Sequence, residues 1–138
     1  MPALDLIHDN VKNALAKDGW TITFDPYRIR FLDALVYADL GAQYPLGARR
    51  GTRKIVVETK SFLGLSPMQE FKLALGQFLL YRAFLEQVAA DHEMYLAVSV
   101  NAYDSFFQKE SIRYVTERYD IALIVVDLET EEIARWTK

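Results

Sequence analysis

Three charged residues in the first half of the chain have the types and the spacing for metal-assisted chemistry. Glu58 and Lys60 follow the apolar run at residues 55–57, which is typical of a strand covered on both faces. Because side chains two residues apart in a strand point to the same side, these two charges are expected to project together. Asp39 comes near the end of the preceding expected strand, at residues 35–40. The sequence thus offers two acids and one lysine at the ends of neighbouring strands.

A hairpin connection would bring these strand ends together. The stretch PLGARRGTR contains one proline and two glycines, so residues 44–52 are expected to form a loop that joins two antiparallel strands. Two carboxylates that converge at a sheet rim form an oxygen site suited to Mg²⁺ or Mn²⁺, and a lysine beside them can activate a metal-bound water. The pattern therefore predicts metal-assisted phosphodiester hydrolysis, although a salt bridge at a strand end is the more frequent reason for such a pair of charges.

Gln77 and Tyr81 are expected to support this site from a helix. They lie four residues apart, so they share one face of the helix expected at residues 68–88, which is apolar on nearly every side. A buried glutamine there should have a hydrogen-bonding task, such as holding a water near the metal or contacting a phosphate. The alternative is a core glutamine that bonds to the backbone.

The opening helix offers a further candidate in His8. It lies four residues after Leu4, at the border of the apolar face, with Asp5 and Asp9 nearby. One of these side chains could reach the site as an outer ligand or a general base. More commonly, such residues cap or solvate a first helix.

Hydrophobic periodicity predicts one domain over residues 1–138, with an α/β (α+β) fold. The first helix should end near Gly19, since glycine suits the left-handed residue that follows a helix. The long helix should start at Ser66 and Pro67, with serine as its cap and proline in its first turn. A third helical region is expected at residues 102–118 and could be broken in the middle, and the C-terminal tail could pair as a hairpin. Because a helix separates buried strands, we expect a mixed central sheet flanked by helices on both faces. The expected strands are residues 21–24, 27–31, 35–40, 54–60, 94–100 and 121–127.

Composition limits the classes of function. The chain has 138 residues, a formal net charge of −3 and no cysteine, which removes disulfides and thiolate sites and fits a reducing cytoplasm. The first ten residues carry acids and no long apolar run, so no signal peptide is expected. No segment approaches the roughly 18 to 20 uninterrupted apolar residues of a membrane span, so none is expected. An acidic total disfavours strong non-specific nucleic-acid binding, so contact with DNA would need a local basic patch, a partner or a metal.

Six cations on neighbouring expected elements could supply such a patch for DNA phosphates. The alternative is that they only solvate a loop and a strand face. They are Arg28, Arg30, Arg49, Arg50, Arg53 and Lys54.

Two motifs together resemble a known nuclease superfamily. The first motif is an aspartate followed, after eighteen residues, by E-x-K on hairpin strands, and the second is Q-x(3)-Y on the next helix. This combination resembles the PD-(D/E)xK superfamily, which has the restriction-endonuclease-like fold. The Q-x(3)-Y element resembles the RecB-type branch. Over nearly its full length the chain also resembles the XisH family, the cyanobacterial excision controlling factors of the fdxN element. The stretches that carry this likeness are DLIHDNVKNALAKDGWTIT, ADLGAQ, VVETKSFLG, ALGQFLLYR, MYLAVSV and IALIVVD.

The resemblance implies a role in site-specific DNA rearrangement, beside a separate recombinase and a small XisI-like partner. It implies that Asp39, Glu58 and the Thr59 carbonyl bind Mg²⁺ or Mn²⁺, and that Lys60 is the catalytic lysine. Gln77 and Tyr81 are implied as further site residues. Ala38 stands where the superfamily motif has proline, and His8 stands in place of a first-helix glutamate.

Two functions remain open from the sequence. The first is a metal-dependent endonuclease that acts on DNA during excision, and the intact set of Asp39, Glu58, Lys60 and Gln77 favours it. The second is a non-catalytic accessory module of the same fold that works through protein partners, and the acidic net charge favours it. The apolar surplus of the long helix also permits a homodimer.

Overall fold

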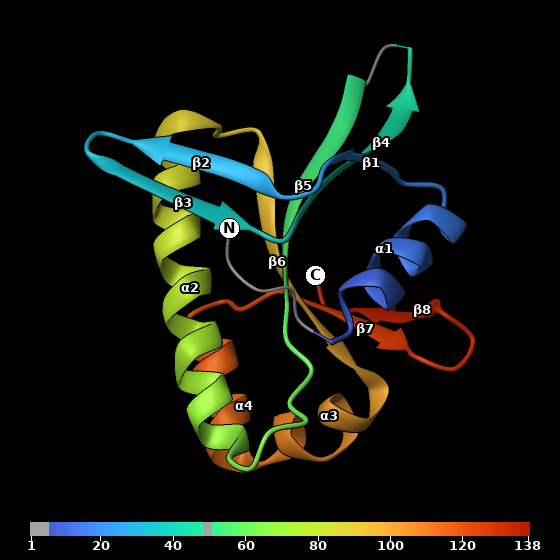
Figure 1. Cartoon of the computed structure of the whole chain (residues 1–138), viewed down its shortest axis with the longest axis vertical. Helices are drawn as coiled ribbons and strands as arrows, with labels where there is room; N and C mark the ends of the chain where they lie inside the picture. The colour runs from blue at the N-terminus through green and yellow to red at the C-terminus, as the bar shows by residue number, and fades with distance from the viewer. Residues whose placement is uncertain (1–5, 49–50) are drawn as a thin grey trace.

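A six-stranded mixed sheet organises the chain (Figure 1). The computed structural model describes residues 6–48 and 51–138. The strand order is β1, β4, β5, β6, β7 and β8; β5, β6 and β7 run parallel, and the remaining neighbours pair antiparallel. The strands are β1 (Thr21–Phe24), β4 (Leu40–Gly47), β5 (Gly51–Thr59), β6 (His92–Ser99), β7 (Leu123–Asp127) and β8 (Glu132–Trp136).

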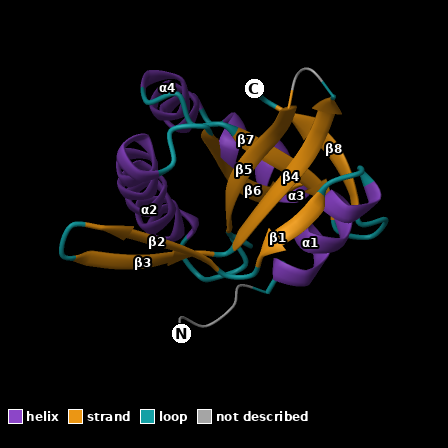
Figure 2. Cartoon of the chain, turned by 90° about the horizontal axis from the view of Figure 1, so that it is seen from above, coloured by secondary structure: helices purple, strands orange, loops and turns teal. Residues whose placement is uncertain are grey.

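Helices cover both faces of this sheet, as Figure 2 shows. One face carries α1 (His8–Lys17); the other carries α2 (Pro67–Val88), α3 (Val100–Asp104), a 3-10 turn (Phe106–Gln108) and α4 (Glu110–Arg118). The strands divide their side chains between the two layers by simple alternation. On β5, Val56 packs in the α2 layer, whereas Ile55 and Val57 pack in the α1 layer. Continuous apolar runs are therefore required in the central strands, because both of their faces are buried.

A separate two-stranded arm crosses α2 (Figure 1). It consists of β2 (Tyr27–Phe31) and β3 (Ala34–Ala38), which pair antiparallel. Ile29 is buried in the α2 layer, and the ring of Phe31 lies 5.4 Å from the ring of Phe84 on α2. The arm is thus fixed to the helix, and its second strand leads directly into Asp39.

The predicted end of α1 and the predicted start of α2 are confirmed. Gly19 follows α1 with a φ of +96°, the left-handed conformation that glycine adopts without steric cost. Ser66 caps α2 by accepting a hydrogen bond from the Gln69 amide, and Pro67 occupies the first turn. The end of α1 and the start of α2 therefore lie where the local residue types favour them.

Two expectations about the Asp39 region are wrong. Residues 44–47 and 51–52 are not a loop, because β4 continues to Gly47 and β5 begins at Gly51, and residues 49–50 lie outside the described residues. Pairing with β5 and packing of Tyr44 on Trp20 stabilise this extended hairpin despite its proline and glycines. Asp39 is also not inside a strand at residues 35–40. It lies between β3 and β4, where the chain passes from the arm to the main sheet.

The predicted α/β (α+β) class, with a mixed sheet between helices, is confirmed. The expected break in the third helical region is confirmed as well, since α3, the 3-10 turn and α4 follow one another there. The C-terminal tail pairs with β7 as β8, as expected for a hairpin.

Candidate functional site

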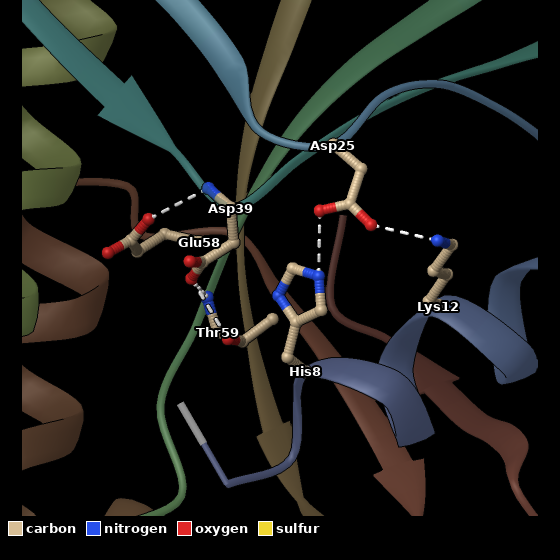
Figure 3. Close-up of polar contacts among 6 residues, drawn as sticks. All are labelled: His8, Lys12, Asp25, Asp39, Glu58 and Thr59. Carbon is tan, nitrogen blue, oxygen red and sulfur yellow. Dashed lines mark hydrogen bonds and ion pairs between the residues drawn. The ribbon is translucent and has the colours of Figure 1, made fainter. Parts of the chain in front are cut away.

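Asp39 and the end of β5 are joined by three hydrogen bonds (Figure 3). The antiparallel register pairs Leu40 with Val57, which puts Asp39 beside Glu58. The Asp39 amide donates to Glu58 Oε1 at 3.2 Å. The Thr59 amide and hydroxyl both donate to Asp39 Oδ2, at 2.7 and 2.9 Å. The predicted meeting of the two acids is therefore present at the sheet rim.

Glu58 is held in an environment that disfavours its ionised form. The side chain is buried, with 4% of its surface exposed. Burial and then the negative charge of Asp39 raise its pKa to about 8, against the opposing positive charge of Lys60. At neutral pH Glu58 accordingly carries a proton most of the time. Asp39 and Lys60 are only half-buried, so solvent reaches the site from their side.

Tyr81 on α2 feels the charges of the same acids, and Gln77 hydrogen-bonds to its hydroxyl. Burial raises the pKa of the Tyr81 hydroxyl, and the charges of Glu58 and Asp39 raise it further, whereas a hydrogen bond with Gln77 lowers it. The Gln77 Oε1 atom is buried and lacks a hydrogen-bond partner among the described residues. A buried acceptor without a partner, next to Tyr81, is a place for a donor such as water or a lysine ammonium.

A polar chain approaches from α1 on the other side of Asp39. His8 is 2% exposed, and its Nε2 lies 2.9 Å from Asp25 Oδ1. Lys12 Nζ donates to Asp25 Oδ2 at 2.8 Å. Burial would raise the pKa of Asp25, but Lys12 and His8 outweigh it, and the pKa lies below its usual value.

The second ring nitrogen of His8 is free for the site. His8 Nδ1 is buried without a partner among the described residues, and in Figure 3 it faces Asp39 and Thr59. Sequence reasoning found His8 but missed Lys12 and Asp25. Asp25 stands seventeen residues from His8 in a turn, and no local pattern links them.

Comparison with known proteins identifies the family. The model of the XisH protein family matches residues 1–134. The chain belongs to the XisH family.

Two crystal structures share this fold. An XisH family protein from Nostoc punctiforme PCC 73102 is 36% identical, covers 97% of this chain and 100% of its own, and superposes with a TM-score of 0.88. An fdxN element excision controlling factor protein from Anabaena variabilis is 39% identical, covers 96% of this chain and 98% of its own, with a TM-score of 0.86. No relative matches among curated proteins.

The cations predicted to contact DNA in this XisH-family chain differ in exposure and in whether they are paired with an acid. Arg28 and Arg30 are exposed and share one side of β2, opposite the buried Ile29. Arg53 lies among aromatic rings and pairs with Glu93 at 2.7 Å, while Lys54 pairs with Asp91 at 3.2 Å. Arg49 and Arg50 lie outside the described residues.

The donor set in this XisH-family site fits a hard divalent cation. Magnesium keeps several waters and takes only one or two carboxylates, which Asp39 and Glu58 supply with the predicted Thr59 carbonyl. Residues 6–48 and 51–138 hold no cluster of three or more histidine, aspartate or glutamate side chains placed for a metal. Within the same residues, no helix has the length and apolarity needed to cross a membrane.

Proposed function

We propose that this protein is an excision controlling factor that acts on DNA as a Mg²⁺- or Mn²⁺-dependent endonuclease of the PD-(D/E)xK superfamily. The observation that carries the proposal is the convergence of Asp39 and Glu58 at one sheet rim, beside Lys60 and the α2 residues Gln77 and Tyr81. The excision role is the one named for the Anabaena variabilis relative. A separate recombinase and an XisI-like protein belong to the same proposal as partners.

Each residue has a role in this proposal. Asp39 offers the metal its free oxygen Oδ1, because Thr59 fixes Oδ2. Glu58 would hold the metal with its carboxylate once it has lost its proton. A bound metal lowers the pKa of a coordinated water and neutralises phosphate charge. Lys60 and Gln77 would orient a water at the site, and His8, fixed by Asp25, would accept a proton from water through Nδ1.

Metal binding tests the site apart from catalysis. Because Glu58 must lose its proton, titration with Mn²⁺ at pH 7 is expected to release close to one proton per metal, measured calorimetrically in buffers of different ionisation enthalpy. Asp39→Asn should abolish the heat of binding, whereas the matched variant Asp33→Asn, an exposed acid in the arm, should keep it. An absence of Mn²⁺ and Mg²⁺ binding by the wild type would reject the metal site.

Nicking of supercoiled plasmid tests the chemistry. Lys60→Ala should lower the metal-dependent rate by roughly a hundredfold or more while Mn²⁺ still binds. Equal nicking by wild type and Lys60→Ala would mean that the cleavage comes from a contaminant.

A non-catalytic accessory role is the alternative, and two observations favour it. The net charge is −3, and Arg53 and Lys54 are engaged by acids of the same chain. If the protein binds metal but no variant changes nicking, this alternative replaces the endonuclease proposal.

A further inference from the structure

The outer face of α2 has the pattern of an interface. In both views α2 lies at the periphery of the molecule (Figures 1 and 2). Its inner face is buried in the core through Phe71, Ala74, Phe78, Tyr81 and Leu85. The opposite face is exposed along the whole helix, and it is this face that carries apolar side chains without a role inside the chain.

The exposed apolar positions recur with the spacing of a helix–helix seam. Leu73 and Leu80 are seven residues apart, with 57% and 46% of their surfaces exposed. Gly76 is also exposed and lies three residues after Leu73 and four before Leu80. The exposed Ala83 follows Leu80 by three residues. Alternating intervals of three and four place side chains on one line along a helix, as in a coiled coil. We call this line the α2 seam; from end to end it consists of Gln69, Leu73, Gly76, Leu80, Ala83 and Gln87.

We propose that two copies of this protein associate through the α2 seam, with their α2 helices antiparallel around a two-fold axis. In such a pair, positions equally far from the axis on opposite sides face each other. An axis near residue 78 puts Leu80 of one copy against Gly76 of the other, and Leu73 against Ala83. Each of these contacts then pairs one large side chain with one small residue. The small residue lets the two backbones approach closely, and the large side chain fills the space between them.

Charge at the edge of the seam selects a second copy as the occupant. Lys72 and Glu86 are both exposed and both lie on the same edge of the α2 seam, at nearly equal distances from the axis. In the antiparallel pair this edge faces its own copy, so Lys72 of each copy meets Glu86 of the other, twice by symmetry. In a parallel pair this edge would face the opposite edge of the other copy, so Lys72 and Glu86 would not meet. The half-buried Leu79 lies on the same edge, next to the axis, where it would meet its own copy.

Gly76 has no explanation inside the monomer. Among the described residues, nothing lies within 4 Å of a Cβ built at this position. A glycine in the middle of a helix destabilises it relative to almost any other residue except proline. The close approach of a second helix at Leu80 gives this glycine a steric reason.

Substitution of Gly76 separates association from folding. Gly76→Leu has room in the monomer and raises helix propensity, so the variant should fold at least as stably as the wild type. In the dimer it would collide with Leu80 twice. Sedimentation equilibrium should show a wild-type dimer with a dissociation constant on the order of micromolar, raised at least about tenfold in Gly76→Leu. A wild type that stays monomeric up to roughly 1 mM overturns the proposal and leaves the α2 seam to a different protein.

Charge reversal tests the partner and the register. Lys72→Glu should weaken the dimer by placing two glutamates together at both ends, and the double variant Lys72→Glu/Glu86→Lys should restore it. Arg113→Glu on α4, an exposed charge that lines a groove with Leu123 of β7 and Arg135 of β8, is the matched control and should leave association unchanged. Equal dissociation constants for Lys72→Glu and Arg113→Glu would contradict the proposal.

Engineered cysteines test the orientation, since the chain has none of its own. Gln69→Cys and Gln87→Cys should form a disulfide when the two variants are mixed, and each alone should form little. Self-crosslinking of Gln69→Cys alone would indicate parallel helices and overturn the antiparallel arrangement.

Discussion

Asp39 connects the two halves of the candidate site. Its amide binds Glu58, which projects toward α2, and its carboxylate accepts two hydrogen bonds from Thr59, which belongs to the other face of the strand. A single residue at the junction of β3 and β4 thus reaches both layers. The raised pKa of Glu58 follows from this closeness together with burial, because two carboxylates that share a small volume do not both ionise readily.

The pKa of Glu58 makes stability depend on pH. The pKa rises from 4.5 to about 8 on folding, so the folded state keeps a proton that the unfolded chain releases between these values. The free energy of unfolding should therefore fall as pH rises through this window. Glu58→Gln should be similar to the wild type at pH 4 and more stable at pH 9, by on the order of a few kcal/mol, in urea unfolding.

Glu117→Gln is the control for that measurement, since Glu117 is an exposed acid on α4. The explanation fails if the wild type and Glu58→Gln lose stability in parallel between pH 5 and 9.

At the scale of elements, the arginines of the β2–β3 arm and of β5 differ in their exposure and in their contacts. Arg28 and Arg30 extend from the free side of the arm. Arg53 is half-buried beside Trp20 and Trp136, and it also donates to Tyr95 at 2.6 Å. Cation–π contacts and charged hydrogen bonds of this kind stabilise a fold. The arm is therefore the better candidate for phosphate contacts, and Arg53 is the better candidate for a structural role.

Substitutions in the two elements should affect different properties, DNA affinity for the arm and stability for β5. Arg28→Gln/Arg30→Gln should lower DNA affinity and reduce the slope of log affinity against log salt by about two, with little change in stability. Arg53→Gln should instead reduce the free energy of unfolding by roughly 1–3 kcal/mol. Fluorescence anisotropy across a salt series, with urea unfolding of each variant, distinguishes the two cases. A salt slope unchanged in the double variant would exclude the arm from DNA contact.

At the scale of the whole molecule, one sheet serves two cores. Phe78 is buried in the α2 layer and Ile124 in the α1 layer, with 1% and 0% of their surfaces exposed. β5, β6 and β7 contribute alternate side chains to both layers, so neither layer can lose its packing while the strands remain in place. The candidate site lies at the rim of this sheet and depends on both cores for its geometry.

Cavities in either core should therefore destabilise the entire domain. Phe78→Ala and Ile124→Ala should each reduce the free energy of unfolding by roughly 2–5 kcal/mol, with a single cooperative transition. Near-ultraviolet and far-ultraviolet circular dichroism should give coincident unfolding curves for both variants. Two separate transitions in either variant would show that the layers are independent.

The sequence by itself determined the strands and helices that local patterns encode. The apolar runs of β5, β6 and β7 predicted strands buried on both faces, and Ser66 and Gly19 predicted helix ends, because periodicity and capping act between near neighbours. The same reasoning failed at residues 44–47, where cross-strand pairing outweighs the local turn preference of proline and glycine. It selected Asp39, Glu58, Lys60, Gln77 and Tyr81 by residue type and spacing.

Only the tertiary structure decided which of these residues meet and what surrounds them. The register of β4 with β5 brings Asp39 to Glu58, and the approach of α1 adds His8 with Asp25, a partner that no local pattern could supply. Burial then raises the pKa of Glu58, and the packing of Trp20 around Arg53 gives that cation a structural environment. These properties depend on distance and on the exclusion of water, which arise only when segments far apart in the chain pack together.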